Sequence, residues 1–499
     1  NDHYGQEGFN RLKNDGYNFK NAHFNYIPTY TGPGHASVYT GTTPRVHGVI
    51  ANDWYDKANE GWRYCVQDND HEGVGGKGEV GQRSPKNLQA STITDELKLF
   101  YQGRSKVVSV SIKDRGAILP GGHHPDGAYW YDGESGNFIT STFYGSKLPK
   151  WVTDFNKENS TKRYLKDGWK TLKDISTYVE SARDNRSYES SLNVDKAPIF
   201  PYDLTAHIKE DEGRSIIRST PYGNTMLLDM ALTALEKEDL GQDDIPDFLA
   251  ISFSSTDYVG HAFGPYSKEI QDTYVRLDRE LARLMNTLDE KVGKGEWTLM
   301  LTADHAVSEI PFYMQEKGFE VNYLSDSLNS ANLAASLKSK FGVDDLIKNI
   351  SNHQVFLDKT LIAKQKLELS AIKGHIIEAM SNYAGIAAVY DSRALSAYAG
   401  DDLDVKVISA GLNGSMSGDV VFTNKAGWLG EYNLMGGTTH GSGYSYDTHV
   451  PMLFYGKGIK SGSTHQYHPI TDIAPTLSML LEIKLPSGAT GQPAVEVLD

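Results

Sequence analysis

Short runs of apolar residues recur along the chain and predict the strands of a buried sheet. The runs span residues 105–112, 247–255, 297–303 and 450–455, and each is nearly continuous. This pattern is typical of strands that are buried on both faces of a mainly parallel sheet. Segments with helical periodicity lie between the runs, for example 94–100 and 272–288. The alternation predicts an α/β fold, with a central, mainly parallel sheet flanked by helices.

Two regions interrupt this alternation and are predicted to be insertions. Residues 121–218 are rich in aromatic, Gly, Asn, Ser and Lys residues and show little periodicity, so we expect an inserted cap or lid over the carboxyl edge of the sheet. Residues 323–413 carry helix and strand patterns without any candidate site motif, which indicates a second insertion. Length alone would suggest about three domains for 499 residues. The motifs described below overrule that number, and we expect a single domain over residues 1–499.

The composition is that of an ordinary folded protein, with 39% hydrophobic and 23% charged residues. The net charge of −15 argues against nucleic acid or an anionic membrane as the main partner, because both would be repelled. No segment approaches the roughly 20 apolar residues of a membrane span. The first residues lack a signal-peptide pattern, so the protein is expected to be either cytoplasmic or an exported protein whose signal has been removed. Cys65 is the single cysteine, so no intramolecular disulfide can form, and this fits a cytoplasmic as well as an exported protein.

Asp and His residues gather beside three of the predicted strands. Two groups follow the runs that end near residues 255 and 303, and one His precedes the run that begins at 450. Ligands of open α/β sheets bind outside the carboxyl ends of the strands, where these side chains would meet. Asp and His together supply the oxygen and nitrogen ligands that suit zinc. The candidate metal ligands are Asp257, His261, Asp304, His305 and His440.

Each of these residues also has a purely structural interpretation. A strand-end Asp is commonly a turn residue or a helix cap, and a lone His such as His440 is commonly a structural residue. Two carboxylates and three imidazoles in three such groups favour a metal site over a set of unrelated coincidences.

A turn rich in Gly and Pro, residues 28–41, is predicted to start a helix. The free N–H groups and the positive dipole end of that helix would face an anion. Thr31 lies at the helix start. Its hydroxyl is either an N-cap without chemistry or, beside a metal ion that lowers its pKa, a nucleophile.

Two basic residues, Lys113 and Arg115, follow the first apolar run. In an extended segment, side chains two positions apart point to the same face, so both cations could hold phosphate oxygens. The alternative is a solvated surface pair with Asp114.

Two competing signatures fail. The Gly-rich segment 73–78 has Gly78 where a phosphate-binding loop needs Ser or Thr to hold magnesium. A cysteine phosphatase needs an Arg about six residues after its nucleophile, whereas His71 stands six residues after Cys65. Nucleophilic cysteine chemistry is therefore not expected.

With these residues in view, the chain resembles the alkaline phosphatase superfamily. It is most similar to the phosphate-irrepressible bacterial alkaline phosphatases, which are themselves similar to nucleotide pyrophosphatase/phosphodiesterases. The resemblance runs from about Gly8 to the C-terminus. The segments that carry it are the Thr31 turn, residues 46–49 and 52–57, the Lys113–Arg115 triplet, and residues 255–261, 302–305, 437–440 and 471–477.

The resemblance implies that Thr31 is a nucleophile that forms a covalent phosphothreonine intermediate. It implies two zinc ions and no magnesium site. The implied ligands of the first zinc ion are Asp257, His261 and His440. Those of the second zinc ion, to which Thr31 would also bind, are Asp304 and His305. The side chains implied to contact the nonbridging oxygens of the phosphoryl group are Asn52, Lys113 and Arg115.

The chain departs from the family pattern at its start. The family has an Asp ligand of the second zinc ion at the end of a strand that precedes the Thr turn, whereas this sequence begins after that point. We expect the native gene product to extend upstream by an export signal, an apolar strand and this Asp. The expected location is therefore periplasmic or secreted.

The expected activity is hydrolysis of phosphate monoesters. A phosphodiesterase or nucleotide pyrophosphatase with the same core is the alternative. Lys113 and Arg115 favour the monoesterase, because additional cations stabilise a dianionic ester. A non-catalytic metal-binding homologue is disfavoured because it should have lost Thr31 and both cations first. We expect a monomer that acts on small-molecule phosphate esters, with no nucleic acid partner and no membrane span.

Overall fold

The apolar runs form strands in the computed structural model, which describes residues 2–76, 78–192, 197–209, 213–430 and 437–498. The strands at the four predicted runs are β6 (Val107–Ser111), β9 (Phe248–Ser252), β10 (Thr298–Thr302) and β17 (Met452–Gly456). The helices at the two predicted helical segments are α4 (Ile93–Phe100) and α12 (Lys268–Leu288). The α/β class is confirmed.

A five-stranded sheet carries the first two of these strands, in the order β5-β8-β7-β6-β9. Its other members are β5 (Gly73–Val74), β7 (Gly127–Asp132) and β8 (Asn137–Ser141). β6 pairs in parallel with both β7 and β9, and all five of its residues are buried. This central strand therefore has the two-sided burial that its continuous apolar run predicts.

β10 and β17 lie in a second, four-stranded sheet with the order β10-β17-β1-β18, completed by β1 (Tyr17–Phe19) and β18 (Gly462–Thr464). β17 pairs antiparallel with both β10 and β1. The expectation of a mainly parallel arrangement is therefore corrected here, because an apolar run reports burial of a strand but not its direction. β9 and β10 are edge strands, and most of their residues are only half-buried.

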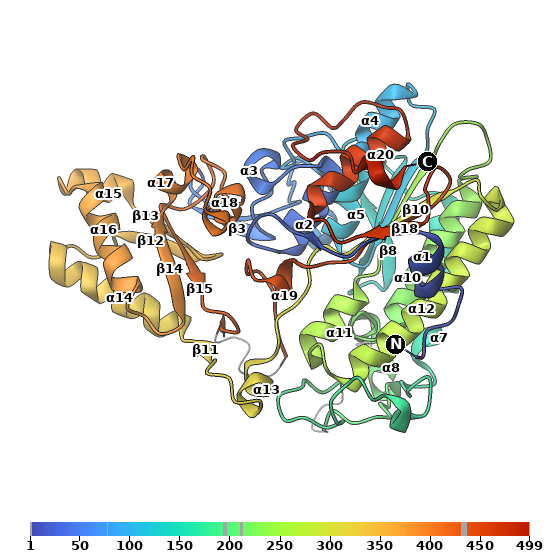
Figure 1. The fold of residues 1–499 in the computed structure, drawn as a ribbon, viewed down its shortest axis with the longest axis horizontal. Coiled ribbons are helices and arrows are strands. Elements are labelled where there is room, and N and C mark those ends of the chain that lie inside the picture. Colours follow the sequence, from blue (N-terminus) through green and yellow to red (C-terminus); the bar gives the residue numbers. More distant parts are fainter. Residues whose placement is uncertain (1, 77, 193–196, 210–212, 431–436, 499) are drawn as a thin grey trace.

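Helices cover both faces of the five-stranded sheet (Figure 1). On one face α5 (Asp114–Gly121) packs on β6 and β7, and α2 (Thr31–Thr40) packs on α5. On the other face α10 (Tyr222–Lys237) packs on β6 and β9, and α12 packs on α10. The side chain of Ser267 caps α12 by accepting a hydrogen bond from the N–H of Ile270.

The predicted second insertion forms a subdomain with its own sheet, seen in orange at the left of Figure 1. The sheet has the order β12-β13-β15-β14. Its strands are β12 (Ile347–Ser351), β13 (Gln354–Leu357), β14 (Ile386–Asp391) and β15 (Val420–Asn424), and its helices include α14 (Asp326–Phe341), α15 (Lys359–Lys364) and α16 (Leu369–Met380). The subdomain continues past residue 413, because β15 pairs with both β13 and β14.

The predicted cap over 121–218 begins inside the main sheet, which corrects that boundary. All six residues of β7 are buried, and Tyr129, Trp130 and Tyr131 within it carry aromatic side chains, which pack well in strands. The later part of the region holds α6 (Lys150–Glu158), α7 (Thr161–Leu165), α8 (Thr205–Lys209) and α9 (Gly213–Ile216). It contacts the core through Ser190, whose N–H donates to the carbonyl of Ala262.

Further short elements connect these layers: α1 (Phe9–Asp15), α3 (Pro44–His47), α11 (Ser255–Phe263), α13 (Pro311–Glu316), α17 (Ser392–Ser396), α18 (Leu403–Ala410), α19 (Ser445–Thr448), α20 (Ile473–Leu480), β2 (Ala22–His23), β3 (Asp53–Asp56), β4 (Gly61–Tyr64), β11 (Tyr323–Leu324), β16 (Leu429–Gly430) and β19 (His468–Pro469). Within the described ranges, no helix combines the length and apolar character that crossing a bilayer requires.

Candidate active site

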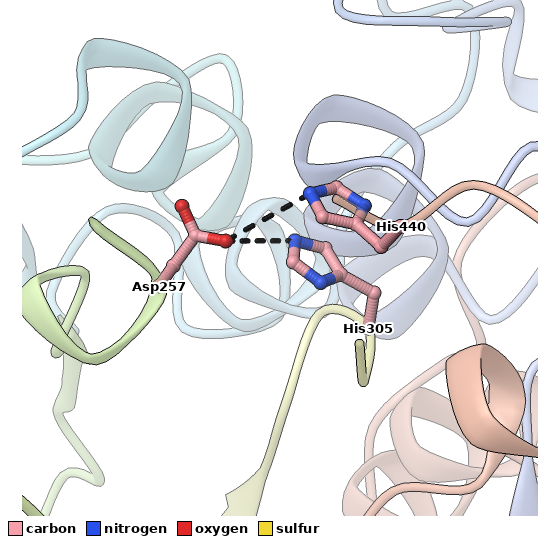
Figure 2. Close-up of side chains that lie close together, drawn as sticks. All are labelled: Asp257, His305 and His440. Atoms are coloured by element: carbon pink, nitrogen blue, oxygen red, sulfur yellow. Dashed lines mark ion pairs between the residues drawn. The ribbon is translucent and has the colours of Figure 1, made fainter. Parts of the chain in front are cut away.

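One carboxylate oxygen is the meeting point of three predicted ligands. Oδ1 of Asp257 lies 3.2 Å from Nε2 of His261, 3.7 Å from Nε2 of His305 and 3.8 Å from Nε2 of His440. Figure 2 shows the last two imidazoles side by side and facing the Asp257 carboxylate. Ligand atoms of Asp257, His305 and His440 all fall within 4.8 Å of one another, close enough to share a metal ion.

The three imidazoles are held with the same ring nitrogen facing Asp257. Nδ1 of His261 lies 2.7 Å from the carbonyl oxygen of Thr438, Nδ1 of His305 lies 2.9 Å from that of Ala306, and Nδ1 of His440 lies 2.6 Å from that of Thr29. A carbonyl only accepts, so each Nδ1 carries a proton and Nε2 is the ring nitrogen left to face Asp257. Burial lowers the pKa of His261, but the Asp257 carboxylate outweighs this and raises that pKa above its ordinary value. Backbone carbonyls orient metal-binding histidines in this way.

These ligands come from separate parts of the fold. α11 follows β9 after two residues and presents Asp257 and His261 one turn apart on the same face. His305 follows the end of β10. His440 lies in the loop after Gly437, a residue whose φ of +80° suits glycine. A Cβ atom there would lie 1.8 Å from the carbonyl oxygen of His261, so only glycine lets the loop approach α11.

Asp304 lies beside this group and is linked to the helix of Thr31. Its Oδ2 is 3.7 Å from Nε2 of His305 and 3.3 Å from Nδ1 of His35. Nδ1 of His35 also lies 3.0 Å from the carbonyl oxygen of Thr31. A Cβ atom at Gly34 would stand 2.2 Å from the carbonyl oxygen of Asp304, so this glycine allows α2 to approach the strand end.

Thr31 is the first residue of α2 and is 1% exposed. Its Oγ1 lies 3.5 Å from Nε2 of His305. The hydroxyl therefore stands at a helix N-terminus and beside the candidate metal ligands, as predicted. The N–H of Gly32, next along the helix, donates to Oδ1 of Asn52 at 2.7 Å. Asn52 thus lies at the same helix start, although its oxygen is used to hold the backbone.

The two basic residues take different positions from those predicted. α5 begins at Asp114, so Lys113 is its extended N-cap residue and Arg115 lies in its first turn. The expectation that both lie on one face of an extended segment is therefore wrong. The ammonium group of Lys113 pairs closely with Oδ2 of Asp257. Nη1 of Arg115 donates to the hydroxyl of Tyr64 at 3.0 Å, and its Nε has no partner among the described residues.

The local charges shift several pKa values. Burial alone would raise the pKa of Asp257, but Lys113 and His261 hold it well below its ordinary value. Burial, and then the ring of His305, holds the pKa of His440 well below its ordinary value. The His305 and His440 rings are stacked with centroids 3.3 Å apart, so the proximity of His305 makes protonating His440 unfavourable. Both shifts favour the states that bind a cation, an ionised carboxylate and a neutral imidazole.

Sequence reasoning missed two residues that position this site. His35 connects Thr31 to Asp304, and its place one helical turn after Thr31 was the available signal. Tyr64 contacts both Asp114 and Arg115, and no motif marks it. Cys65 is fully buried, which raises the pKa of its thiol to about 12, in agreement with the exclusion of cysteine chemistry.

Comparison with known proteins places this geometry in a family. The family model of type I phosphodiesterases and nucleotide pyrophosphatases matches residues 2–445. The chain is 44% identical to alkaline phosphatase PafA of Elizabethkingia meningoseptica over 498 residues, which is 99% of this chain and 90% of that protein. It is 41% identical to alkaline phosphatase PhoV of Synechococcus elongatus over 505 residues, covering 99% of this chain and 89% of the relative.

The fold agrees with that of a solved relative over the whole chain. The crystal structure of wild-type PafA superposes with a TM-score of 0.96 at 42% identity, covering 100% of this chain and 95% of that one. The resemblance to the alkaline phosphatase superfamily is thereby confirmed. The chain belongs to the type I phosphodiesterase/nucleotide pyrophosphatase family, in the branch that holds these bacterial alkaline phosphatases.

Proposed function

We propose that this site hydrolyses phosphate monoesters, with Thr31 as the attacking group. The observation that carries the proposal is the convergence of three Nε2 atoms on one oxygen of Asp257, with the Thr31 hydroxyl 3.5 Å from one of them. Relatives that are 44% and 41% identical over nearly the whole chain bear the name alkaline phosphatase, which supports the same activity here.

The residues present fit two zinc ions, and no magnesium site is proposed. Asp257, His261 and His440 would hold the first ion, and Asp304 and His305 would hold the second. The donor set of carboxylates and neutral imidazoles suits zinc. When bound, two such ions stabilise the attacking and the leaving oxygens of an in-line displacement.

The proposed reaction consists of two successive displacements at phosphorus. The hydroxyl of Thr31 gives up its proton and its oxygen forms a bond to phosphorus while the bond to the ester oxygen breaks, and the ester oxygen takes up a proton to leave as the alcohol. Water then attacks the phosphothreonine, and phosphate leaves as the hydroxyl of Thr31 is restored. The position of Thr31 at the start of α2 supports this role, because free N–H groups at a helix N-terminus favour a negatively charged phosphoryl group.

Three polar side chains would contact the nonbridging oxygens. Arg115 has an unpartnered buried Nε within the described residues, and this donor suits a phosphoryl oxygen. Lys113 pairs with Asp257 in the structure. A cation on Asp257 would compete for that carboxylate, and the ammonium group would then be free to meet the substrate. The side chain of Asn52 lies at the N–H of Gly32, beside the same position.

A phosphodiesterase activity is the second candidate, because the matching family model bears that name. Rates on p-nitrophenyl phosphate and bis-p-nitrophenyl phosphate, measured side by side with zinc added, separate the two. We expect the monoester to be the better substrate, since the dianion meets the charges of Lys113 and Arg115. A faster diester reaction would overturn the proposal. We further propose a monomer that works in the periplasm or outside the cell, which sedimentation and cell fractionation test.

A further inference from the structure

A cavity of about 330 Å³ lies between the inserted subdomain and the loop that carries His440. One wall comes from the subdomain and includes Tyr383, Asn424 and Trp428. The opposite wall comes from the site and includes Tyr30 and His440. One candidate metal ligand therefore faces both the reacting centre and this cavity.

The subdomain wall is attached to the main domain near the site. Nδ2 of Asn352, at the turn between β12 and β13, donates to the carbonyl oxygen of Asp53 at 2.7 Å. On the other side, the hydroxyl of Tyr444 donates to the carbonyl oxygen of Asn424 at 3.1 Å. These two hydrogen bonds hold the walls together, so the cavity has a defined shape.

The lining suits a flat ring. The aromatic side chains of Tyr383, Phe422, Trp428, Tyr444 and Tyr446 all line the cavity, and the rings of the last two are stacked with centroids 5.5 Å apart. Aromatic faces and edges attract a further ring in stacked or edge-on contact.

We infer that this cavity is the subsite for the leaving alcohol, and that it selects phosphate monoesters whose alcohol carries an aromatic ring. The inference rests on the proposed function. In an in-line displacement the leaving oxygen stands opposite the attacking oxygen of Thr31. His440 belongs to the ligand set proposed for that leaving side, and the cavity opens beside it.

Two esters of primary alcohols test the subsite: ethyl and benzyl phosphate. We expect the zinc-loaded enzyme to prefer benzyl over ethyl phosphate in kcat/KM. Trp428→Ala and Tyr444→Leu should each lower the benzyl-to-ethyl ratio by about two- to tenfold. Phe319→Ala is the control, because Phe319 is 57% exposed and lies outside the cavity lining.

Equal losses on both esters, or a wild-type enzyme without ring preference, would overturn the inference. Trp428 packs against the core of the subdomain, so Trp428→Ala could prevent folding. Tyr444→Leu then still tests the subsite. Binding of benzylphosphonate and ethylphosphonate, measured by calorimetry, needs no turnover. Tighter binding of benzylphosphonate that Tyr444→Leu removes supports the subsite even if neither of the esters is hydrolysed, and in that case only the proposed function fails. Equal binding of both phosphonates rejects the subsite.

Discussion

At the scale of single residues, the site depends on hydrogen bonds that fix which atom faces the reaction. The three candidate ligand histidines all place Nδ1 at hydrogen-bond distance from a backbone carbonyl. The hydroxyl of Thr31 is left at the helix start with His305 beside it. These side chains are already oriented, so their removal should change chemistry more than it changes folding.

Thr31→Ala should lower kcat by on the order of a thousandfold or more, because the attacking oxygen is removed. Thr31→Ser should keep much of the activity. Thr40→Ala is the matched control, since Thr40 lies on the same helix and its hydroxyl only donates to the carbonyl oxygen of Ala36. Steady-state rates and thermal unfolding of all three variants check this. Near-normal turnover by the first variant would place the nucleophile elsewhere.

Lys113→Ala and Arg115→Ala should each lower kcat/KM more for p-nitrophenyl phosphate than for bis-p-nitrophenyl phosphate. A monoester dianion carries the additional charge that these cations meet, so a difference of about tenfold or more between the two losses is expected. Arg63→Ala is a suitable control, because Arg63 pairs with Asp56 away from the ligand cluster. The same loss on both substrates would mean that Lys113 and Arg115 support the structure of the site and do not set its preference for monoesters.

At the scale of elements, α12 carries an unusual buried acid. Glu269 is fully buried, and Tyr202 donates to its Oε1 at 2.6 Å while Oε2 has no partner among the described residues. Burial raises the pKa of Glu269 to about 8. The folded protein therefore holds a proton that the unfolded chain releases above its ordinary pKa of 4.5. Stability should fall as the pH rises from about 4.5 to about 8.

Glu269→Gln should remove this dependence, because the amide does not titrate. We expect the variant to gain a few degrees in Tm relative to wild type at pH 8, and little or nothing at pH 4.5. Glu290→Gln, at an exposed position just after the same helix, should leave the profile unchanged. Tm measured across this range is the test. A parallel shift of the variant at every pH would show that Glu269 is not protonated in the folded state.

At the scale of the whole molecule, the candidate metal ligands join three distant parts of the chain. Asp257 lies on α11, His305 follows β10, and His440 lies after the inserted subdomain. Two ions held among these parts would therefore stabilise the folded state as a unit, since the unfolded chain offers no such sites.

Removing zinc with a chelator should abolish activity and lower Tm by several degrees, and added zinc should restore both. His305→Ala should bind less zinc by elemental analysis, and the chelator should then change its Tm less. His449→Ala, an exposed histidine of the same C-terminal region, should behave like wild type. Full activity in protein shown to be metal-free would rule out the proposed chemistry.

Much of this arrangement could be predicted from local patterns. Continuous apolar runs located β6, β9, β10 and β17, although only a central strand such as β6 has the two-sided burial that such a run indicates. Residue types beside the strands identified the candidate metal ligands that the structure brings together around Asp257. Each of these features depends on a short stretch of the chain, so the sequence of that stretch was enough to predict it.

Other features were decided only by the tertiary structure. The directions of β10 and β17, the position of β7 inside the sheet and the contact of Lys113 with Asp257 depend on how distant segments meet. The same holds for the cavity beside His440, whose two walls are separated in the chain. The sequence by itself determined which chemical groups are present and which elements carry them. Their partners, pKa values and shared cavity were decided by packing, because these depend on distances in space that local patterns do not encode.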